Sequence, residues 1–197
     1  MPSMSDMGIT NQYWGICGFT STFYAMYGLH SDKLDNTGNV RSRVIAEIKG
    51  YLQMLKADES ALLGDIETFT KTFGGYESFT IDGYIKKINE SVSKSDSELK
   101  SIDFSIAMTP DAVADYIKRA WGYTATVSKS GDGDGVIGVC DDPATMPMYD
   151  GLCHYMYRKG GKIYSWGSEF SSIQAAADSL NGSPTWKLCR LISINWG

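Results

Sequence analysis

Residues 109–128, TPDAVADYIKRAWGYTATVS, contain the point at which the hydrophobic period of the chain changes. Thr109 is a good helix cap and is followed by proline, which fits the first helical position, while Gly122 is a typical residue just past a helix end. From Tyr123 onward the apolar residues are β-branched or aromatic and come in short runs. The segment therefore predicts a helix that begins at Thr109-Pro110, ends at Gly122 and is followed directly by a strand.

Helical patterns precede this segment and strand patterns follow it. Apolar residues recur at helical spacing in four earlier stretches, which begin near residues 15, 40, 62 and 84, whereas strand-like runs occupy 123–127, 136–140, 152–157, 162–166 and 186–196, with a short helix around 171–180. Runs of helices followed by runs of strands predict an α+β fold with an antiparallel sheet. We expect a single domain over 1–197, with a mainly helical half (1–122) and a mainly β half (123–197).

Composition and charge exclude several classes of protein. With 43% hydrophobic and 21% charged residues, the 197-residue chain has the make-up of an ordinary globular protein and not of a disordered or fibrous one. Its formal charge is −5 and its longest basic cluster is Arg158-Lys159, so we expect no nucleic-acid partner and no anionic membrane surface. No run of about 18 apolar residues is present, so no membrane span is expected.

The N-terminal residues and the cysteines bear on where the protein acts. The first seven residues, MPSMSDM, contain neither a positive start nor an apolar run, so no classical secretory signal is predicted. A chain of this length does not need disulfides for stability, and we expect its four cysteines to be free thiols. These features predict a cytoplasmic protein, or one secreted by a specialised, signal-peptide-independent system.

No metal or other cofactor is expected. The segment 131–135, GDGDG, has aspartates at alternate positions but lacks the third acid and the distal glutamate of a calcium-binding loop, which favours a plain hairpin turn. Cys140, Cys153, His154 and Cys189 suffice in number for a zinc ion, yet the spacings typical of structural zinc sites, such as Cys-x-x-Cys, do not occur.

Cys17, in the segment NQYWGICGFTS (residues 11–21), is the candidate nucleophile. It lies at the start of an amphipathic helix, where the helix dipole stabilises a thiolate, and the small residues Gly15 and Gly18 leave room for a substrate. The alternative interpretation is an ordinary buried cysteine at a helix start, where the thiol packs as a small hydrophobic group.

The chain has only two histidines, and one of them can be placed beside Cys17. His30 lies thirteen residues further along, which at helical rise is about 20 Å from the thiol. His154 opens a strand that turns at 159–162 into a second strand, and a sheet folded back onto the helix can bring it to the thiol. The alternative is a lone core or surface histidine. We predict a Cys17–His154 pair.

These residues resemble the motifs of the papain-like cysteine hydrolase superfamily: Gln12 ahead of Cys17-Gly18, a helix that begins at the cysteine, a histidine at a strand start, and an aromatic-Ser-Trp-Gly run at 164–167. Helices first and antiparallel sheet second is also the layout of that superfamily. Within it, the chain is most similar to the small, divergent branch of bacterial effector proteases and effector glutamine deamidases. The resemblance implies that Cys17 is the nucleophile, that His154 is its general base, and that Gln12 and the backbone N–H of Cys17 form the oxyanion hole.

The residue that orients His154 is predicted from strand alternation. Tyr164 stands where plant-type members of the superfamily have asparagine. A two-residue turn at Gly160-Gly161, or a turn centred one residue earlier, puts Ser165 and Glu169 on the face of His154 and puts Tyr164 on the other face. We expect the hydroxyl of Ser165 to accept the N–H of His154, with the carboxylate of Glu169 as the second candidate.

The predicted function is hydrolysis of an amide bond in a protein or peptide, by a thiol protease or a protein glutamine deamidase that acts as a bacterial effector, toxin or other virulence factor. Cys153 adjoins His154 and points to the opposite face of the strand, so we expect Cys17 to be the only cysteine whose loss abolishes activity. Two alternatives remain, a non-catalytic binding protein on the same fold and a cell-wall amidase. The oligomeric state is not predicted.

Overall fold

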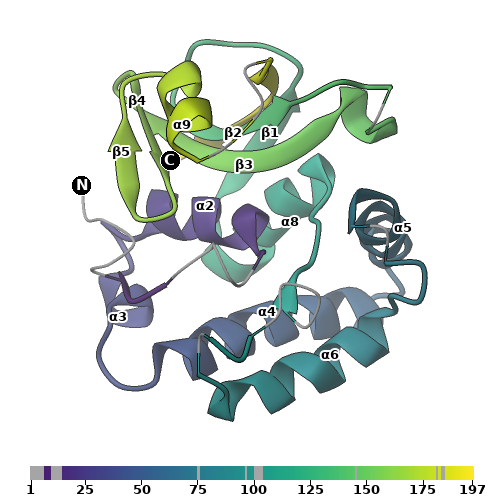
Figure 1. The fold of residues 1–197 in the computed structure, drawn as a ribbon. Coiled ribbons are helices and arrows are strands. Elements are labelled where there is room, and N and C mark those ends of the chain that lie inside the picture. Colours follow the sequence, from purple (N-terminus) through teal and green to yellow (C-terminus); the bar gives the residue numbers. More distant parts are fainter. Residues whose placement is uncertain are drawn as a thin grey trace.

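Figure 1 shows the computed structural model, which describes residues 7–9, 15–74, 76–95, 97–99, 104–144, 146–180, 182 and 185–197. The helices are α2 (Cys17–Met26), α3 (Ser31–Leu34), α4 (Val40–Ala57), α5 (Leu62–Gly74), α6 (Ile81–Glu90), α8 (Pro110–Trp121) and α9 (Ile173–Ser179), with 3-10 turns at Ser91–Ser93 and Met148–Asp150. The strands are β1 (Thr124–Ser128), β2 (Gly135–Cys140), β3 (Leu152–Lys159), β4 (Lys162–Ser165), β5 (Ser168–Phe170) and β6 (Lys187–Asn195). Among the helices described, not one has both the length and the hydrophobicity of a membrane span.

The predicted α+β fold is confirmed, because the helices come mainly first and the strands form one antiparallel sheet. The strand order is β1-β6-β2-β3-β4-β5. Strand β6 pairs with both β1 and β2 and lies between them. The segment 131–135 therefore connects two strands that do not pair, and the prediction of a hairpin turn there is wrong. Consecutive strands usually pair, and the insertion of a distant strand leaves no local signal in the sequence.

Helix α8 is the element that the sequence predicted most closely. The side chain of Thr109 accepts a hydrogen bond from the backbone N–H of Ala112 at 3.1 Å, and Gly122, with φ of 80°, ends the helix. Helix α3 and strand β5 were not predicted, because elements of four and three residues are too short to show a hydrophobic period.

The two faces of the sheet are covered by different helices (Figure 1). Helices α2 and α8 pack on one face, α4 and α6 form a further layer beyond them, and α5 lies beside α8. Phe19 of α2 links these layers, since its ring lies 6.2 Å from that of Tyr51 in α4 and 4.9 Å from that of Tyr116 in α8. Helix α9 covers the other face, where Ala176 packs with Ile137 of β2. This layering holds the start of α2 against the start of β3.

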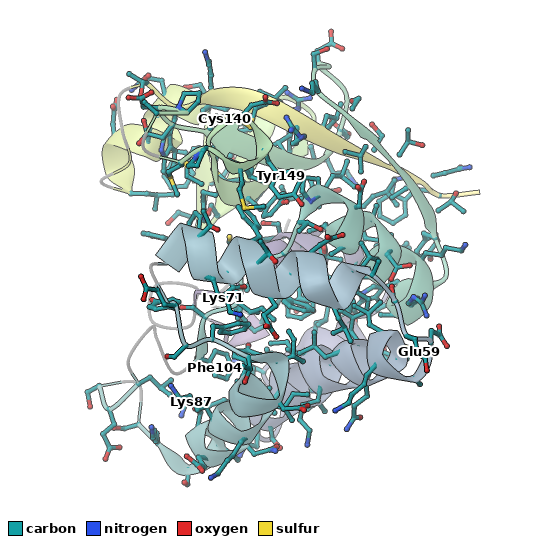
Figure 2. The ribbon with its side chains drawn as sticks, turned by 90° about the vertical axis from the view of Figure 1, so that its right-hand side faces the viewer. Glu59, Lys71, Lys87, Phe104, Cys140 and Tyr149 are labelled. Atoms are coloured by element: carbon teal, nitrogen blue, oxygen red, sulfur yellow. A yellow bond between two sulfur atoms is a disulfide. The ribbon has the colours of Figure 1, made fainter. Side chains whose placement is uncertain are left out.

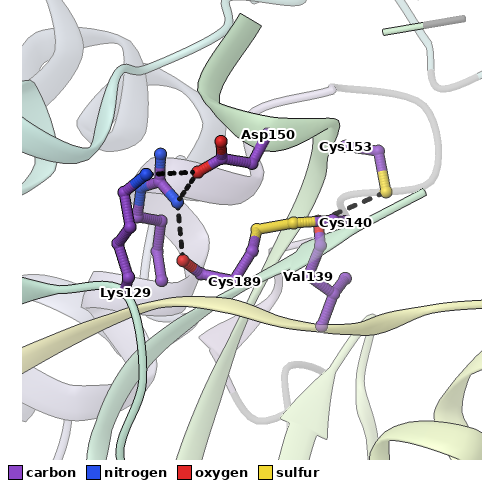
Figure 3. Close-up of a disulfide and its surroundings, with 7 residues drawn as sticks. Lys129, Val139, Cys140, Asp150, Cys153 and Cys189 are labelled. Atoms are coloured by element: carbon purple, nitrogen blue, oxygen red, sulfur yellow. Dashed lines mark hydrogen bonds and ion pairs between the residues drawn. A yellow bond between two sulfur atoms is a disulfide. The ribbon is translucent and has the colours of Figure 1, made fainter. Parts of the chain in front are cut away.

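Cys140 and Cys189 form a disulfide between β2 and β6 (Figure 3), which corrects the prediction of four free thiols. The ladder between the two strands shifts register between Gly138 and Val139, so β6 carries one extra residue, Cys189. This bulge brings Cys189 beside Cys140, with their Cα atoms 5.8 Å apart. The bulge has no signature in the sequence, which is why the pairing was not predicted. Cys17 and Cys153 are free.

Candidate active site

A cavity of about 230 Å³ lies between the helical half and the start of β3. Its walls come from the start of α2, from α5, from the segment that leads into α8, and from the start of β3 with the turn after β4. The lining residues are Gly15, Cys17, Phe69, Thr70, Phe73, Tyr76, Ser105, Ile106, Ala107, Met108, Leu152, Cys153, His154, Tyr155 and Trp166. Cys17 and His154 therefore border one cavity, although they come from the two halves of the chain.

Cys17 is the first residue of α2, and its side chain packs against the core that α2 shares with the sheet. The sulfur accepts a hydrogen bond from the backbone N–H of Tyr155, the residue directly after His154. Burial raises the pKa of the Cys17 thiol to about 11, and the backbone hydrogen bonds offset this only in part. Burial therefore opposes a resting thiolate at this helix start, contrary to the expectation from the sequence.

His154 lies on β3 opposite Val139 of β2 and is only 6% exposed. Its Nε2 lies 2.9 Å from the Oγ of Ser165. Two indoles flank the ring: that of Trp166 meets it edge-on, at 5.6 Å and 74°, and that of Trp186 is stacked on it, at 5.6 Å and 25°. Burial lowers the pKa of His154 to about 4, so the imidazole is neutral at pH 7.

Cys17 and His154 are both neutral at rest, so the thiol still carries its proton and the imidazole has a nitrogen that can accept one. Nε2 of His154 is engaged with Ser165, which leaves Nδ1 as the ring nitrogen outside that contact. The pair then carries no charge at rest. The arrangement can support attack of the sulfur on a carbonyl carbon in the cavity.

Ser165 reaches His154 through one of the two registers considered for this hairpin, the one with a two-residue turn. The turn is formed by Gly160-Gly161, with φ of 55° and 76°, and Tyr157 of β3 pairs with Tyr164 of β4. Ser165 thus lies on the face of His154, and Tyr164 packs into the core on the other face. The contact between the Ser165 hydroxyl and the imidazole is the one expected first from the alternation of the strands.

Glu169 does not reach His154, which corrects the second candidate for the orienting residue. The chain reverses at Trp166-Gly167, where φ is 47° and 81°, and β5 runs back along β4 so that Glu169 pairs with Tyr164. The carboxylate lies 2.9 Å from Nζ of Lys162 on the surface. The prediction assumed that side chains alternate along one continuous strand from Ser165 to Glu169. The turn interrupts that strand, so Glu169 lies on the face of Tyr164.

Cys153 also borders the cavity, which corrects the expectation that it points away from the site. His154 pairs with Val139 and Leu152 pairs with Cys140, so Cys153 is the extra residue of a second bulge, where the strict alternation of a strand is interrupted. Its sulfur lies 3.4 Å from the carbonyl oxygen of Val139, and burial raises the pKa of the thiol to about 12. The candidate oxyanion residue Gln12 lies outside the described residues.

Sequence reasoning missed the aromatic wall of the cavity and the indole of Trp186. Phe69 and Phe73 follow the period of α5, which predicts core packing and does not distinguish it from a cavity wall. The 40% exposure of Phe73 is a structural observation that no pattern in the sequence indicates. Tyr149, in the connection between β2 and β3, extends to this helix (Figure 2), where its ring lies 4.9 Å from that of Phe69. This contact joins the β half to α5 beside the cavity.

Neither a metal site nor a known relative adds to this description. In the part of the chain that the structure describes, no three His, Cys, Asp or Glu side chains are grouped so that they could hold a metal ion. Comparisons of the chain with models of protein families, with curated proteins and with solved structures gave no match.

Proposed function

We propose that the protein is a cysteine-dependent hydrolase of amide bonds. The observation that carries the proposal is that Cys17 and His154 border one cavity while Ser165 engages Nε2 of the imidazole. A nucleophile, a base and a group that orients the base are the three parts that thiol hydrolysis requires. The papain-like resemblance of the segments around Cys17 and His154 agrees with this assignment of roles.

The mechanism begins with transfer of the Cys17 proton to Nδ1 of His154 as the sulfur attacks the carbonyl carbon of the substrate. The tetrahedral oxygen accepts a hydrogen bond from the backbone N–H of Cys17, with Gln12 as the second donor expected from the resemblance. His154 gives its proton to the leaving nitrogen, the C–N bond breaks, and an amine or ammonia departs. Water, deprotonated by His154, then hydrolyses the thioester and restores the thiol.

The lining of the cavity favours a protein or peptide substrate with an apolar side chain near the bond that is cleaved. Phe69, Phe73 and Tyr76 supply an aromatic wall opposite the sheet. None of the described lining residues is Asp, Glu, Lys or Arg, so the cavity offers no charged partner to a charged side chain. Proteolysis and glutamine deamidation share every chemical step, and an apolar wall favours proteolysis, because a carboxamide side chain needs polar partners.

The proposal is tested by incubating the protein and its Cys17→Ala variant with a diverse peptide mixture and with glutamine-rich protein substrates. Mass spectrometry of the products distinguishes cleavage of the backbone from conversion of glutamine to glutamate. Cys153→Ala is the matched control, because Cys153 borders the same cavity and is also free. We expect cleavage by the wild type and the control and none by Cys17→Ala. Equal activity of the Cys17→Ala variant contradicts the proposal.

A non-catalytic binding protein on the same fold is the second candidate, and the raised pKa of the Cys17 thiol favours it. Iodoacetamide separates the two candidates, since a thiol activated by a base is alkylated at mildly acid pH and an inert buried thiol is not. We expect Cys17 to be labelled in the folded protein, and to be labelled far more slowly in the His154→Ala variant. Resistance of Cys17 to labelling in the folded protein contradicts an activated thiol and favours the binding protein. A cell-wall amidase shares the thiol chemistry, and release of amino groups from peptidoglycan identifies it.

A further inference from the structure

The stacking of Trp186 on His154 is the contact of the site that the proposed mechanism leaves without a role. The indole of Trp166 meets the imidazole edge-on, whereas that of Trp186 lies nearly parallel to it, with 25° between the planes and 5.6 Å between the centroids. This is the offset-stacked geometry, and it brings the π-face of a tryptophan within the distance at which it attracts a cation.

The backbone of Gly182, beyond the end of α9, holds Trp186 in this position. A Cβ atom on Gly182 would lie only 2.6 Å from the indole, so the backbone of Gly182 packs directly against Trp186. The N–H of Gly182 in turn donates to the carbonyl oxygen of Ala177 at 2.8 Å, at the end of α9. Trp186 is therefore placed between a helix end and His154, and its indole restricts rotation of the imidazole about the bond to its Cβ.

The imidazolium formed during catalysis has few other sources of stabilisation. The titratable side chains among the described residues around the cavity are those of Cys17, Tyr76, Cys153 and Tyr155, beside His154 itself, and no carboxylate is present there. Ser165 contributes a neutral hydroxyl. Burial opposes the charge on His154, and the indole that lies on its ring can offset part of that cost.

We propose that Trp186 is a positioning residue for the Cys17–His154 pair. Its indole fixes the plane of the imidazole, so that Nε2 stays on Ser165 and Nδ1 stays available to Cys17, and its π-face stabilises the imidazolium that forms when the thiol proton is transferred. The inference rests on the proposed function, since it assigns Trp186 a part in the same proton transfer. In this step the S–H bond of Cys17 breaks and an N–H bond forms at Nδ1 of His154, while the sulfur bonds to the carbonyl carbon and the carbonyl π electrons move to its oxygen.

The test compares Trp186→Phe with Trp186→Leu, because both keep an apolar side chain and only phenylalanine keeps a π-face. The ring proton resonances of His154 are followed by NMR across a pH titration, with His30, the second histidine of the chain, as the internal reference. We expect the pKa of His154 to be higher in the phenylalanine variant than in the leucine variant by at least about half a pH unit, or about threefold in proton affinity. Equal values in the two variants overturn the proposal.

A second readout follows the reaction of Cys17 itself. The rate of alkylation by iodoacetamide is measured on the peptide that contains Cys17, with the Cys153 peptide as reference, and we expect it to be about tenfold lower in Trp186→Leu and near the wild-type rate in Trp186→Phe. Trp196→Leu is the matched control, since Trp196 is 43% exposed and contacts Tyr123. A uniform loss in all three variants contradicts a positioning role. If Cys17 of the wild type does not react, the proposed function fails, and the NMR comparison still decides whether Trp186 supports the imidazolium.

Discussion

The four cysteines form two pairs that lie in different structural settings. Cys140 and Cys189 are on adjacent strands, and a bulge in β6 brings their sulfurs together as a disulfide. Cys17 and Cys153 come from a helix start and a strand start, stay free, and border a cavity. Figure 3 shows how close the two settings are, with Cys153 on the strand next to the disulfide. Strand pairing holds two cysteines close enough for a disulfide bond. A helix and a strand that meet only at their ends leave a cavity between them, which is large enough for part of a substrate.

The largest expected difference between the two pairs is in activity. Replacement of Cys17 by alanine removes the atom that attacks in the proposed mechanism, so turnover should fall to the background rate. A double variant in which Cys140 and Cys189 are both alanine keeps the cavity residues and should remain active while it is folded. The measurement is hydrolysis of the substrate found in the peptide screen, at a temperature where circular dichroism shows both proteins to be folded. Loss of activity in both Cys17→Ala and the double alanine variant would mean that the two pairs of cysteines do not differ in their importance for activity.

The next expected effect is on stability. Here the disulfide pair should matter and the free cysteines should not. The disulfide closes a loop of 49 residues, and loop closure of that length corresponds to about 4 kcal/mol in the free energy of unfolding. The double alanine variant should therefore unfold at a much lower urea concentration than the wild type, whereas Cys17→Ala should stay close to it. Wild-type protein in a dithiol reductant is the control and should match the double variant. An unchanged midpoint contradicts a bond between Cys140 and Cys189.

The free energy of unfolding should also depend on pH through His154, which borders the cavity with the free cysteines. The contribution of the disulfide should not depend on pH in this way. The pKa of His154 is lowered from 6.5 to about 4 in the folded protein, so the unfolded chain binds a proton more readily. The contribution of His154 to the free energy of unfolding is fully present above pH 6.5 and decreases as the pH falls towards 4. The total decrease across this range is about 3 kcal/mol. Urea unfolding at a series of pH values measures it, and a His154→Gln variant should lack this part of the slope. The same slope in both proteins means that other groups produce it.

The smallest effect concerns the polar support of His154. Ser165→Ala removes the partner of Nε2 and should lower turnover by about tenfold, because the imidazole loses its orientation but remains a base. Glu169→Gln should change turnover little, since its carboxylate pairs with Lys162 on the surface. Initial rates at saturating substrate distinguish the two. A larger loss in Glu169→Gln reverses the assignment of the orienting residue.

The sequence predicted those elements and contacts that local patterns encode. The cap at Thr109 and the stop at Gly122 define α8, and the Gly160-Gly161 turn fixes the register that takes Ser165 to His154. Period and turn chemistry are local properties, and they were sufficient for the fold class and for this contact.

The features that the sequence did not predict depend on contacts between distant segments. Two bulges decide where Cys153 and Cys189 point, and a bulge changes the alternation without a characteristic residue. The turn at Trp166-Gly167 takes Glu169 away from the site although a tryptophan is an unusual residue at positive φ. The lowered pKa of His154 and the raised pKa of Cys17 follow from burial, which only the assembled cavity defines.

The place of β6 in the sheet determines when the protein can fold during its synthesis. Strand β6 is the last strand along the chain, yet it lies between β1 and β2. A nascent chain that has left the ribosome only as far as β5 has no partner for the facing edges of β1 and β2, and these edges stay open to other chains. The strands β1 and β2 can be joined through β6 only once residues 187–195 are available, so this part of the sheet forms after the other described strands have been made.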